Sequence, residues 1–341
     1  MKLPPQVRRI AAYGGGGLGV ASVVGAAGLA GLMWGEAKLA ERRIPTATDA
    51  PPISHDTIWA APGVSAVRPP IRLALLGDST AAGYGVHRDR DTPAAQLAIG
   101  ISDAARRPVH VTNVAVVGAE SRNLPDQLER LGKARPELAI VMIGANDVTE
   151  LTKPSVAVPY LEKAVLALRD LGAEVIVATC PDLGTIRPIA QPLRAYARRL
   201  SRRMAREQTV AVVRAGGRTV SLGDLLGPMF ATRIELFAAD LFHPSEEGYR
   251  EASLAILPSA LDALGIRTRT RSASTFTTRR SKPIERAAAQ AAARPGSEVA
   301  PSDARPVTAM RAGGTWARLR RRRPRDPVTV RTEAAVPVRP E

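Results

Sequence analysis

The chain has 341 residues, enough for one or two domains, and carries 48 Lys and Arg against 32 Asp and Glu, a formal net charge of +16. A hydrophobic fraction of 45% excludes a wholly disordered chain. The single cysteine excludes an intrachain disulfide framework and a cysteine-only zinc cluster, and four histidines leave little room for a polyhistidine metal site.

The N-terminal segment, residues 1–44, contains an uncharged stretch from Ile10 to Gly35 that is flanked by three Lys or Arg residues on each side. About 20 apolar residues suffice to span a bilayer, and glycine is tolerated in membrane helices. We predict an uncleaved signal anchor at about residues 10–35. A signal peptide cleaved after Gly28-Leu29-Ala30 is the alternative. The anchor predicts a cell-membrane protein with its folded domain outside, and cleavage predicts secretion. The equal flanking charges leave the orientation open.

Residues 45–70 contain six prolines and little apolar periodicity. This composition predicts an extended linker between the N-terminal segment and a folded domain.

From Ile71 onward, short runs rich in β-branched residues alternate with helical patterns. The predicted strands are Ile71–Leu76, Val109–Val117, Leu138–Ile143, Val175–Thr179 and Val210–Val213. The predicted helices are Pro93–Arg106, Leu124–Lys133, Val156–Leu171, Leu193–Glu207 and Glu246–Leu264. Apolar strands that alternate with helices predict a doubly wound α/β domain over residues 71–265, with its parallel sheet covered on both faces. Ligands bind such sheets at the carboxyl ends of the strands.

The excess positive charge lies mostly beyond this domain. Residues 266–341 hold 18 Lys and Arg against 6 Asp and Glu, whereas residues 71–265 hold 23 against 22. The C-terminal composition, rich in Arg, Ala and Pro without sustained apolar periodicity, predicts a basic disordered tail over 266–341. Contact with an anionic surface and a solvated tail without a specific partner both stay open. The near-neutral domain argues against a specific nucleic-acid partner.

Polar clusters follow three of the predicted strands and precede the last helix. They are Gly77-Asp78-Ser79-Thr80, Gly118-Ala119-Glu120-Ser121, Gly144-Ala145-Asn146-Asp147 and Asp240-Leu241-Phe242-His243. The core needs no polar residue at these places, so the clusters are the candidate site.

Each cluster supplies a part of acyl-transfer chemistry. A serine hydroxyl such as that of Ser79 needs a base before it can act as a nucleophile, and His243 is the candidate base. Asp240, three residues before His243, can accept a hydrogen bond from the imidazole and fix its tautomer. The backbone N–H groups of Ser79 and Gly118 and the side-chain amide of Asn146 are candidate donors to a tetrahedral oxyanion.

Other residues near these clusters have simpler interpretations. We interpret Asp78 and Asp147 as residues that order loops, and Cys180 as a small buried thiol. Asp182 follows a predicted strand and is a candidate to approach the site.

The order of the four clusters resembles the SGNH hydrolases, also called the GDSL esterase/lipase family, over residues 71–264. The resemblance implies a flavodoxin-like, three-layer α/β/α sandwich with a five-stranded parallel sheet. It implies Ser79 as nucleophile, His243 as base with Asp240 as its orienter, and an oxyanion hole that includes Gly118 and Asn146. Thr80 stands where the family's motif name has Leu. The anchor followed by this domain is similar to exported esterases of actinobacteria.

These observations together predict a serine esterase that hydrolyses carboxylic esters, with short acyl chains, through an acyl-enzyme on Ser79. The expected substrate is a small ester, a lipid or an acylated glycan, and the chemistry needs no metal or organic cofactor. An O-acyltransferase that uses the same residues is one alternative. A non-catalytic cell-surface protein that binds through its basic tail is the other.

Overall fold

The computed structural model describes residues 31–32, 35–36, 38–39, 50–52, 56–65 and 67–266, and four short strands further on at 282–283, 297–301, 316–321 and 337–338. Most of the predicted anchor and much of the predicted tail lie outside these residues. Among the helices that the structure describes, none combines the length and the apolar character that crossing a membrane requires.

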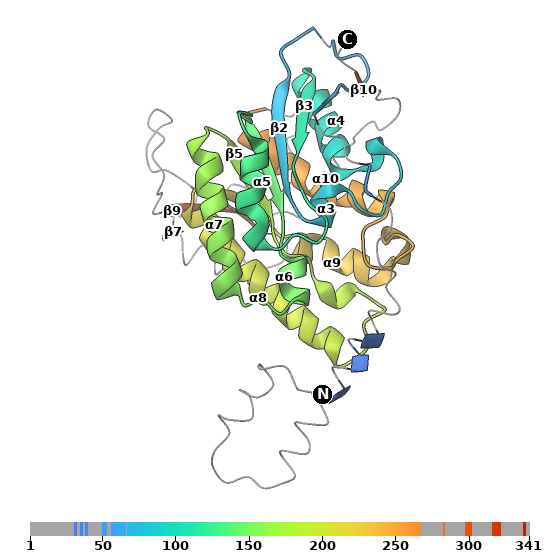
Figure 1. Ribbon diagram of the computed structural model, residues 1–341. Helices are drawn as coiled ribbons and strands as arrows, with labels where there is room; N and C mark the ends of the chain where they lie inside the picture. The colour runs from blue at the N-terminus through green and yellow to red at the C-terminus, as the bar shows by residue number, and fades with distance from the viewer. Residues whose placement is uncertain are drawn as a thin grey trace.

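Five parallel strands form the centre of the domain (Figure 1). In chain order they are β2 (Ile71–Gly77), β3 (Val109–Asn113), β4 (Leu138–Met142), β5 (Glu174–Ala178) and β6 (Arg218–Val220). Their spatial order is β3-β2-β4-β5-β6. The register pairs Gly77 with Met142 and Met142 with Ala178, so the carboxyl ends of these strands meet at one edge. The predicted number of parallel strands, five, is therefore confirmed, but antiparallel strands at both edges make the sheet ten-stranded within the described residues.

Helices cover both faces of this sheet. On one face α4 (Pro93–Ala105) and α10 (Glu246–Ala263) pack against inward-facing strand residues such as Leu75 and Ile140. On the other face α5 (Leu124–Leu131), α7 (Pro154–Asp170) and the end of α8 (Leu193–Arg214) pack against Leu76 and Val141. Neighbouring residues of one strand thus point to opposite cores, as strand geometry requires. The arrangement is the predicted three-layer α/β/α sandwich.

One predicted strand is wrong. Val210–Val213 lies inside α8, and the fifth parallel strand is β6, which follows the turn at Gly216-Gly217. A run of four apolar residues does not separate a strand from the buried face of a helix. Here Ala211 and Val212 continue a helical face that already includes Met204 and Gln208, so the helix runs beyond its predicted end at Glu207.

Part of the predicted linker belongs to the sheet. Strand β1 (Thr57–Trp59) pairs antiparallel with β3, and Trp59 is fully buried. Without β1, β3 would present a row of unpaired backbone groups on that side, and a buried tryptophan contributes a large apolar area. Proline content alone did not reveal this short strand.

Parts of the C-terminal region also extend the sheet. Strand β8 (Ser297–Pro301) pairs antiparallel with β6, β9 (Trp316–Arg321) pairs with β8, and β7 (Lys282–Pro283) pairs with β9. Strand β10 (Pro337–Val338) pairs with β1 at the opposite edge. The structure therefore differs from the predicted disordered tail over these residues, because the short edge strands β6 and β1 offer free backbone groups to pair.

Candidate active site

Ser79 lies at the point where β2 ends. It is the first residue of the short helix α3 (Ser79–Ala82), and Asp78 caps this helix by accepting a hydrogen bond of 2.9 Å from the Thr80 N–H. The turn requires glycine at position 77. Its φ of +139° is rarely adopted by residues that have a side chain, and a Cβ at this position would collide with the Met142 carbonyl. The sequence thus directs the Ser79 hydroxyl out of the sheet at its carboxyl edge.

The predicted nucleophile, base and orienter come together although Ser79 and His243 are 164 positions apart. The Ser79 Oγ lies 3.0 Å from Nε2 of His243, and Nδ1 of His243 lies 2.5 Å from Oδ2 of Asp240. The other carboxylate oxygen of Asp240 accepts hydrogen bonds of 2.9 Å from the Phe242 and His243 N–H groups. One tight turn therefore holds the acid and the imidazole in a fixed relation.

The charge of Asp240 is stabilised where it lies. Burial opposes its ionisation, but the hydrogen bonds from the His243 ring and from two backbone N–H groups outweigh that effect, so its pKa lies below the usual value. An ionised Asp240 can stabilise an imidazolium when His243 takes up a proton.

Aromatic rings keep the imidazole in place. The centroid of the Tyr84 ring lies 4.5 Å from the centroid of the His243 ring. The centroid of the Phe242 ring lies 5.0 Å from it, and these two rings pack edge to face. The His243 side chain is 13% exposed, so it is largely shielded yet still reachable by a ligand. A restrained ring of this kind keeps Nε2 directed at the serine.

The structure also connects the candidate oxyanion residues. Asn146 lies in α6 (Ala145–Thr149) and its Nδ2 donates a hydrogen bond of 2.9 Å to the carbonyl of Ala119, next to Gly118. Gly118 has a φ of +80° with open space around the position of its missing Cβ. Within the described residues, neither the Ser79 nor the Gly118 N–H donates to a protein acceptor. An amide nitrogen carries two hydrogens, so Asn146 keeps a second donor.

The two aspartates interpreted as loop-ordering residues make contacts that fit this interpretation. Asp147 accepts hydrogen bonds from the Ser121 N–H at 3.0 Å and from its hydroxyl at 2.8 Å, which ties the loop after β3 to the end of β4. Burial raises the pKa of Asp147, although the Ser121 hydrogen bonds oppose it. Burial also raises the pKa of Asp78 to about 6.

Cys180 is buried, which raises its thiol pKa well above the usual value.

Two buried glutamines that support the site were not predicted from the sequence. Gln127 accepts a hydrogen bond from the Gly77 N–H and donates one to the Gly77 carbonyl, each at 2.8 Å. Gln208 accepts from the Cys180 N–H at 2.8 Å and donates to the Ile143 carbonyl at 2.9 Å. Both satisfy backbone groups just where strands end at the site. The sequence does contain one sign of such a role, which is a polar residue on the apolar face of a helix. Gln127 is an example, because it lies on the same buried face of α5 as Leu124 and Leu131.

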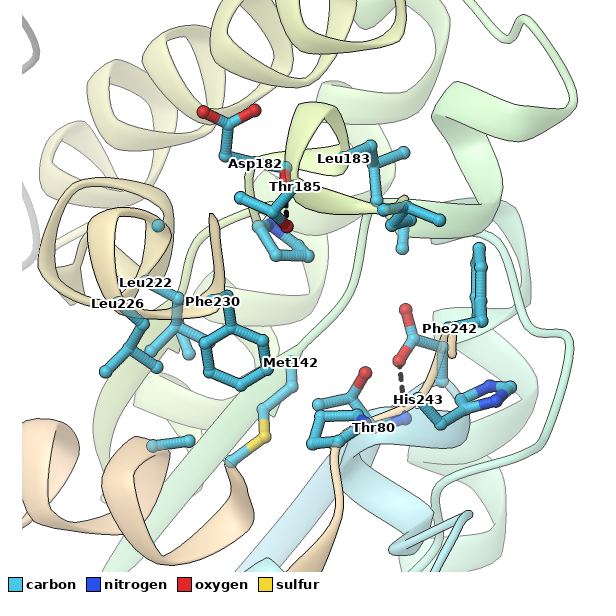
Figure 2. A pocket seen from close by; sticks show the side chains of 18 of the residues that line it. Thr80, Met142, Asp182, Leu183, Thr185, Leu222, Leu226, Phe230, Phe242 and His243 are labelled. Carbon is cyan, nitrogen blue, oxygen red and sulfur yellow. Dashed lines mark hydrogen bonds between the residues drawn. The ribbon is translucent and has the colours of Figure 1, made fainter. Parts of the chain in front are cut away.

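A cavity of about 90 Å³ opens beside Ser79 and His243 (Figure 2). Its lining is mostly apolar. The side chains of Met142, Leu222, Leu226 and Phe230 form the wall away from His243. Leu222, Leu226 and Phe230 come from α9 (Leu222–Thr232), the helix that follows β6. Among the described residues, no three His, Cys, Asp or Glu side chains are grouped as a metal site would require.

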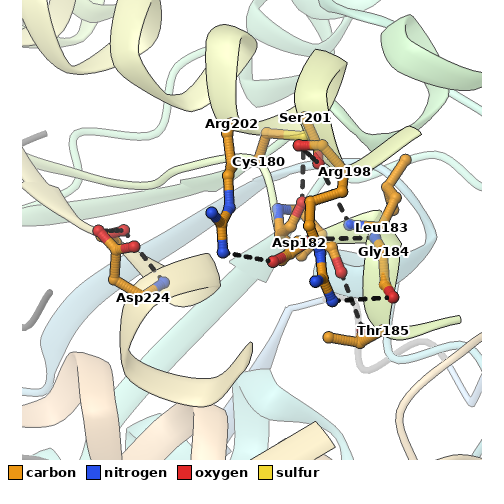
Figure 3. Close-up of polar contacts among 11 residues, drawn as sticks. Cys180, Asp182, Leu183, Gly184, Thr185, Arg198, Ser201, Arg202 and Asp224 are labelled. Atoms are coloured by element: carbon orange, nitrogen blue, oxygen red, sulfur yellow. Dashed lines mark hydrogen bonds and ion pairs between the residues drawn. The ribbon is translucent and has the colours of Figure 1, made fainter. Parts of the chain in front are cut away.

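Asp182 does line this cavity, but its carboxylate forms hydrogen bonds and ion pairs with neighbouring residues of the protein (Figure 3). Oδ1 accepts a hydrogen bond of 2.9 Å from the Gly184 N–H and lies 3.4 Å from Nε of Arg198. Oδ2 lies 3.2 Å from a guanidinium nitrogen of Arg202. These contacts hold the short helix η3 (Leu183–Thr185), another part of the cavity wall, against α8.

A hydroxyl, an imidazole and a carboxylate hydrogen-bonded in this order define a serine hydrolase site. A sequence profile of the family described as "GDSL-like Lipase/Acylhydrolase family" matches residues 75–251. The chain is also 39% identical over 246 residues to the GDSL-like esterase Rv1075c of Mycobacterium tuberculosis, an alignment that covers 70% of this chain and 78% of that protein. The chain therefore belongs to the GDSL-like lipase/acylhydrolase family, the predicted one, and is a carboxylic ester hydrolase.

Solved structures with a similar chain course include a lipase/acylhydrolase from Enterococcus faecalis. That match has 22% identity and a TM-score of 0.45, and it covers 57% of this chain and 97% of the other. A catalytic mutant of Axe2, an acetylxylan esterase from Geobacillus stearothermophilus, matches with 18% identity and a TM-score of 0.45 over 58% of this chain and 97% of the other.

Proposed function

We propose that the chain hydrolyses carboxylic esters through an acyl-enzyme on Ser79. The observation that carries the proposal is the continuous contact from Ser79 Oγ to His243 Nε2 at 3.0 Å and from His243 Nδ1 to Asp240 at 2.5 Å. A base within hydrogen-bond distance of the hydroxyl, with its own tautomer fixed, is what an activated serine requires.

The proposed reaction has two halves. Ser79 Oγ bonds to the ester carbonyl carbon while His243 Nε2 takes the hydroxyl proton. The tetrahedral intermediate then expels the alcohol, whose oxygen receives that proton from His243. A water molecule attacks the acyl-enzyme, His243 takes one of its protons and returns it to Ser79 Oγ, and the carboxylic acid leaves.

We propose that the negative oxygen of each tetrahedral intermediate accepts hydrogen bonds from the Ser79 and Gly118 N–H groups and from the Asn146 amide. The support is that both N–H groups lack a protein acceptor within the described residues and that Asn146 contacts the residue beside Gly118. Donors set in place before reaction stabilise the developing charge without reorganisation.

We propose short, apolar acyl chains as the preferred substrates. The cavity next to Ser79 is small, about 90 Å³, and Leu222, Leu226 and Phe230 line its apolar end. A carboxylate or ammonium on the acyl group would lose its hydration there without gaining a partner on these side chains.

We also propose that residues 10–35 anchor the chain in the cell membrane with its hydrolase domain outside, or direct secretion if the segment is cleaved. The support is the uncharged stretch and its flanking cations. The contact of residues 266–341 with anionic surfaces remains a prediction from their charge.

The proposed mechanism is tested with p-nitrophenyl acetate, butyrate and octanoate and with the Ser79→Ala and His243→Ala variants. We expect turnover of the acetate and butyrate esters by the wild type and a loss of several orders of magnitude in each variant. Wild-type rates in either variant would contradict the mechanism. Product analysis in the presence of glycerol separates hydrolysis from acyl transfer to an alcohol.

A further inference from the structure

Helix α8 carries the densest positive charge of the folded domain. Its 22 residues include seven arginines and a single carboxylate, Glu207. Residues 71–265 as a whole are almost neutral, with 23 Lys and Arg against 22 Asp and Glu. The charge of the domain is therefore unevenly distributed, and this helix is where the excess lies.

The arginines of α8 fall into two groups. Arg198 and Arg202 form ion pairs with Asp182, so they have a structural role in the cavity wall (Figure 3). Arg199, Arg203 and Arg206 are exposed, and none of the three forms an ion pair or side-chain hydrogen bond with the part of the chain that the structure describes.

These three arginines share one face of the helix. Residues three, four and seven positions apart lie above one another on a helix, which places Arg199, Arg203 and Arg206 in a line. Tyr196, three positions before Arg199, is 42% exposed on the same side. The opposite side of α8, with Ser201, Met204, Gln208 and Val212, is buried. We call Tyr196, Arg199, Arg203 and Arg206 the arginine stripe.

One described residue of the N-terminal segment, Glu36, contacts the start of this helix. Oε2 of Glu36 accepts a hydrogen bond of 2.9 Å from the Leu193 N–H, the first residue of α8. Figure 1 shows the described N-terminal pieces beside that end of α8. Glu36 directly follows the uncharged stretch from Ile10 to Gly35. An anchored chain would therefore leave the lipid next to the arginine stripe.

We propose that the arginine stripe docks on the headgroups of an anionic lipid surface. The planar guanidinium group matches phosphate oxygens with two parallel hydrogen bonds, and tyrosine is enriched at the membrane–water interface. Each cation near an anionic leaflet strengthens attachment several-fold. The three arginines have no ion-pair partner among the described residues, so they supply this attraction from one face of the helix without breaking a contact that the structure describes.

The docking is tested with the full chain reconstituted into vesicles. An environment-sensitive nitrobenzoxadiazole label is attached to an Ala195→Cys variant, because Ala195 is exposed beside the stripe. Cys180 is buried and should not react, and labelling of the unsubstituted chain checks this. We expect the fluorescence to rise and shift to the blue in vesicles that contain phosphatidylglycerol, and to stay unchanged in pure phosphatidylcholine.

Two triple variants make the test specific. Arg199→Gln/Arg203→Gln/Arg206→Gln removes the charge of the stripe and should lower the docking equilibrium constant by about a hundredfold. Arg130→Gln/Lys133→Gln/Lys163→Gln removes three exposed cations from α5, its following turn and α7, and should leave the response intact. Circular dichroism and thermal melting identify any variant that fails to fold. If the triple variant of the stripe fails to fold, single substitutions in the stripe are tested in its place.

Three results would overturn the proposal. The first is an equal response in neutral vesicles, which would assign the contact to apolar attraction. The second is an undiminished response in the folded stripe variant. The third is an equal response when RNA replaces the anionic lipid, which would assign the stripe to nucleic acid.

Discussion

Replacing Gln127 by methionine should destabilise the domain far more than its position on a surface helix would indicate. The side chain is fully buried and its amide spans the Gly77 N–H and carbonyl, each at 2.8 Å. Methionine has similar length and helix propensity but cannot replace either hydrogen bond. The perturbation therefore isolates the two polar contacts.

The size of the expected destabilisation depends on which hydrogen bonds the Gly77 N–H and carbonyl keep in the variant. The Gly77 carbonyl still accepts a hydrogen bond of 3.1 Å from the Val116 N–H, so it loses only one of two partners. The Gly77 N–H is left buried with no acceptor, which costs about 1–3 kcal/mol, and the weakened carbonyl adds about 1 kcal/mol. We expect the free energy of unfolding to fall by about 2–4 kcal/mol.

Urea unfolding of the purified full chain measures this change as a shift of the transition midpoint. The dependence of the unfolding free energy on urea concentration should stay the same. Glu129→Gln, an exposed substitution on the same helix, is the control and should stay within about 0.5 kcal/mol of wild type. A loss below about 1 kcal/mol for Gln127→Met would refute the reasoning, since it would mean that the strand end does not need the amide.

Three further predictions concern the site. Asp240→Asn should lower kcat by roughly three to four orders of magnitude with little change in KM, because the amide cannot stabilise the imidazolium; steady-state ester kinetics decide this, and a loss under tenfold would contradict the role. Phe230→Ala should shift the preferred acyl chain of a p-nitrophenyl ester series to greater length, because the ring lines the end of the cavity; an unchanged profile would remove α9 from substrate selection. Asp78 has a folded-state pKa of about 6 against an ordinary 3.8, so its contribution to stability is present below pH 4 and is lost as pH rises through 6. Asp78→Asn should remove that loss, and its stability relative to wild type should grow by about 2 kcal/mol between pH 4 and pH 7; denaturation at both pH values measures it, and a constant difference would argue against a raised pKa.

The sequence predicts the site better than its surroundings. Ser79, Asp240 and His243 stand out because polar residues at strand ends serve no core, and the Asp-x-x-His spacing fits one turn. Their approach to one another follows from the parallel sheet, since the carboxyl ends of its strands meet at one edge. The polar contacts of Gln127 and Gln208 were not predicted, because a glutamine in a helix pattern gives no sign of the distant backbone group that it satisfies.

The mistakes about the fold have a common physical cause. Val210–Val213 has the composition of a strand, and only its packing against neighbouring residues of α8 makes it helical. Residues Thr57–Trp59 lie in a proline-rich stretch, and only the free edge of β3 makes them a strand. In each case a tertiary contact overrides the local pattern, and a single sequence does not show where that contact is.

The most direct test of the central claim is to trap the acyl-enzyme. The chain is mixed with p-nitrophenyl butyrate, quenched with acid within the first turnover, digested and examined by mass spectrometry. We predict a butyryl group on the peptide that contains Ser79, together with a burst of p-nitrophenol that matches the enzyme concentration. Ser79→Ala should show neither. Turnover of the ester without acylation of Ser79, or a burst that survives in Ser79→Ala, would contradict the proposed mechanism.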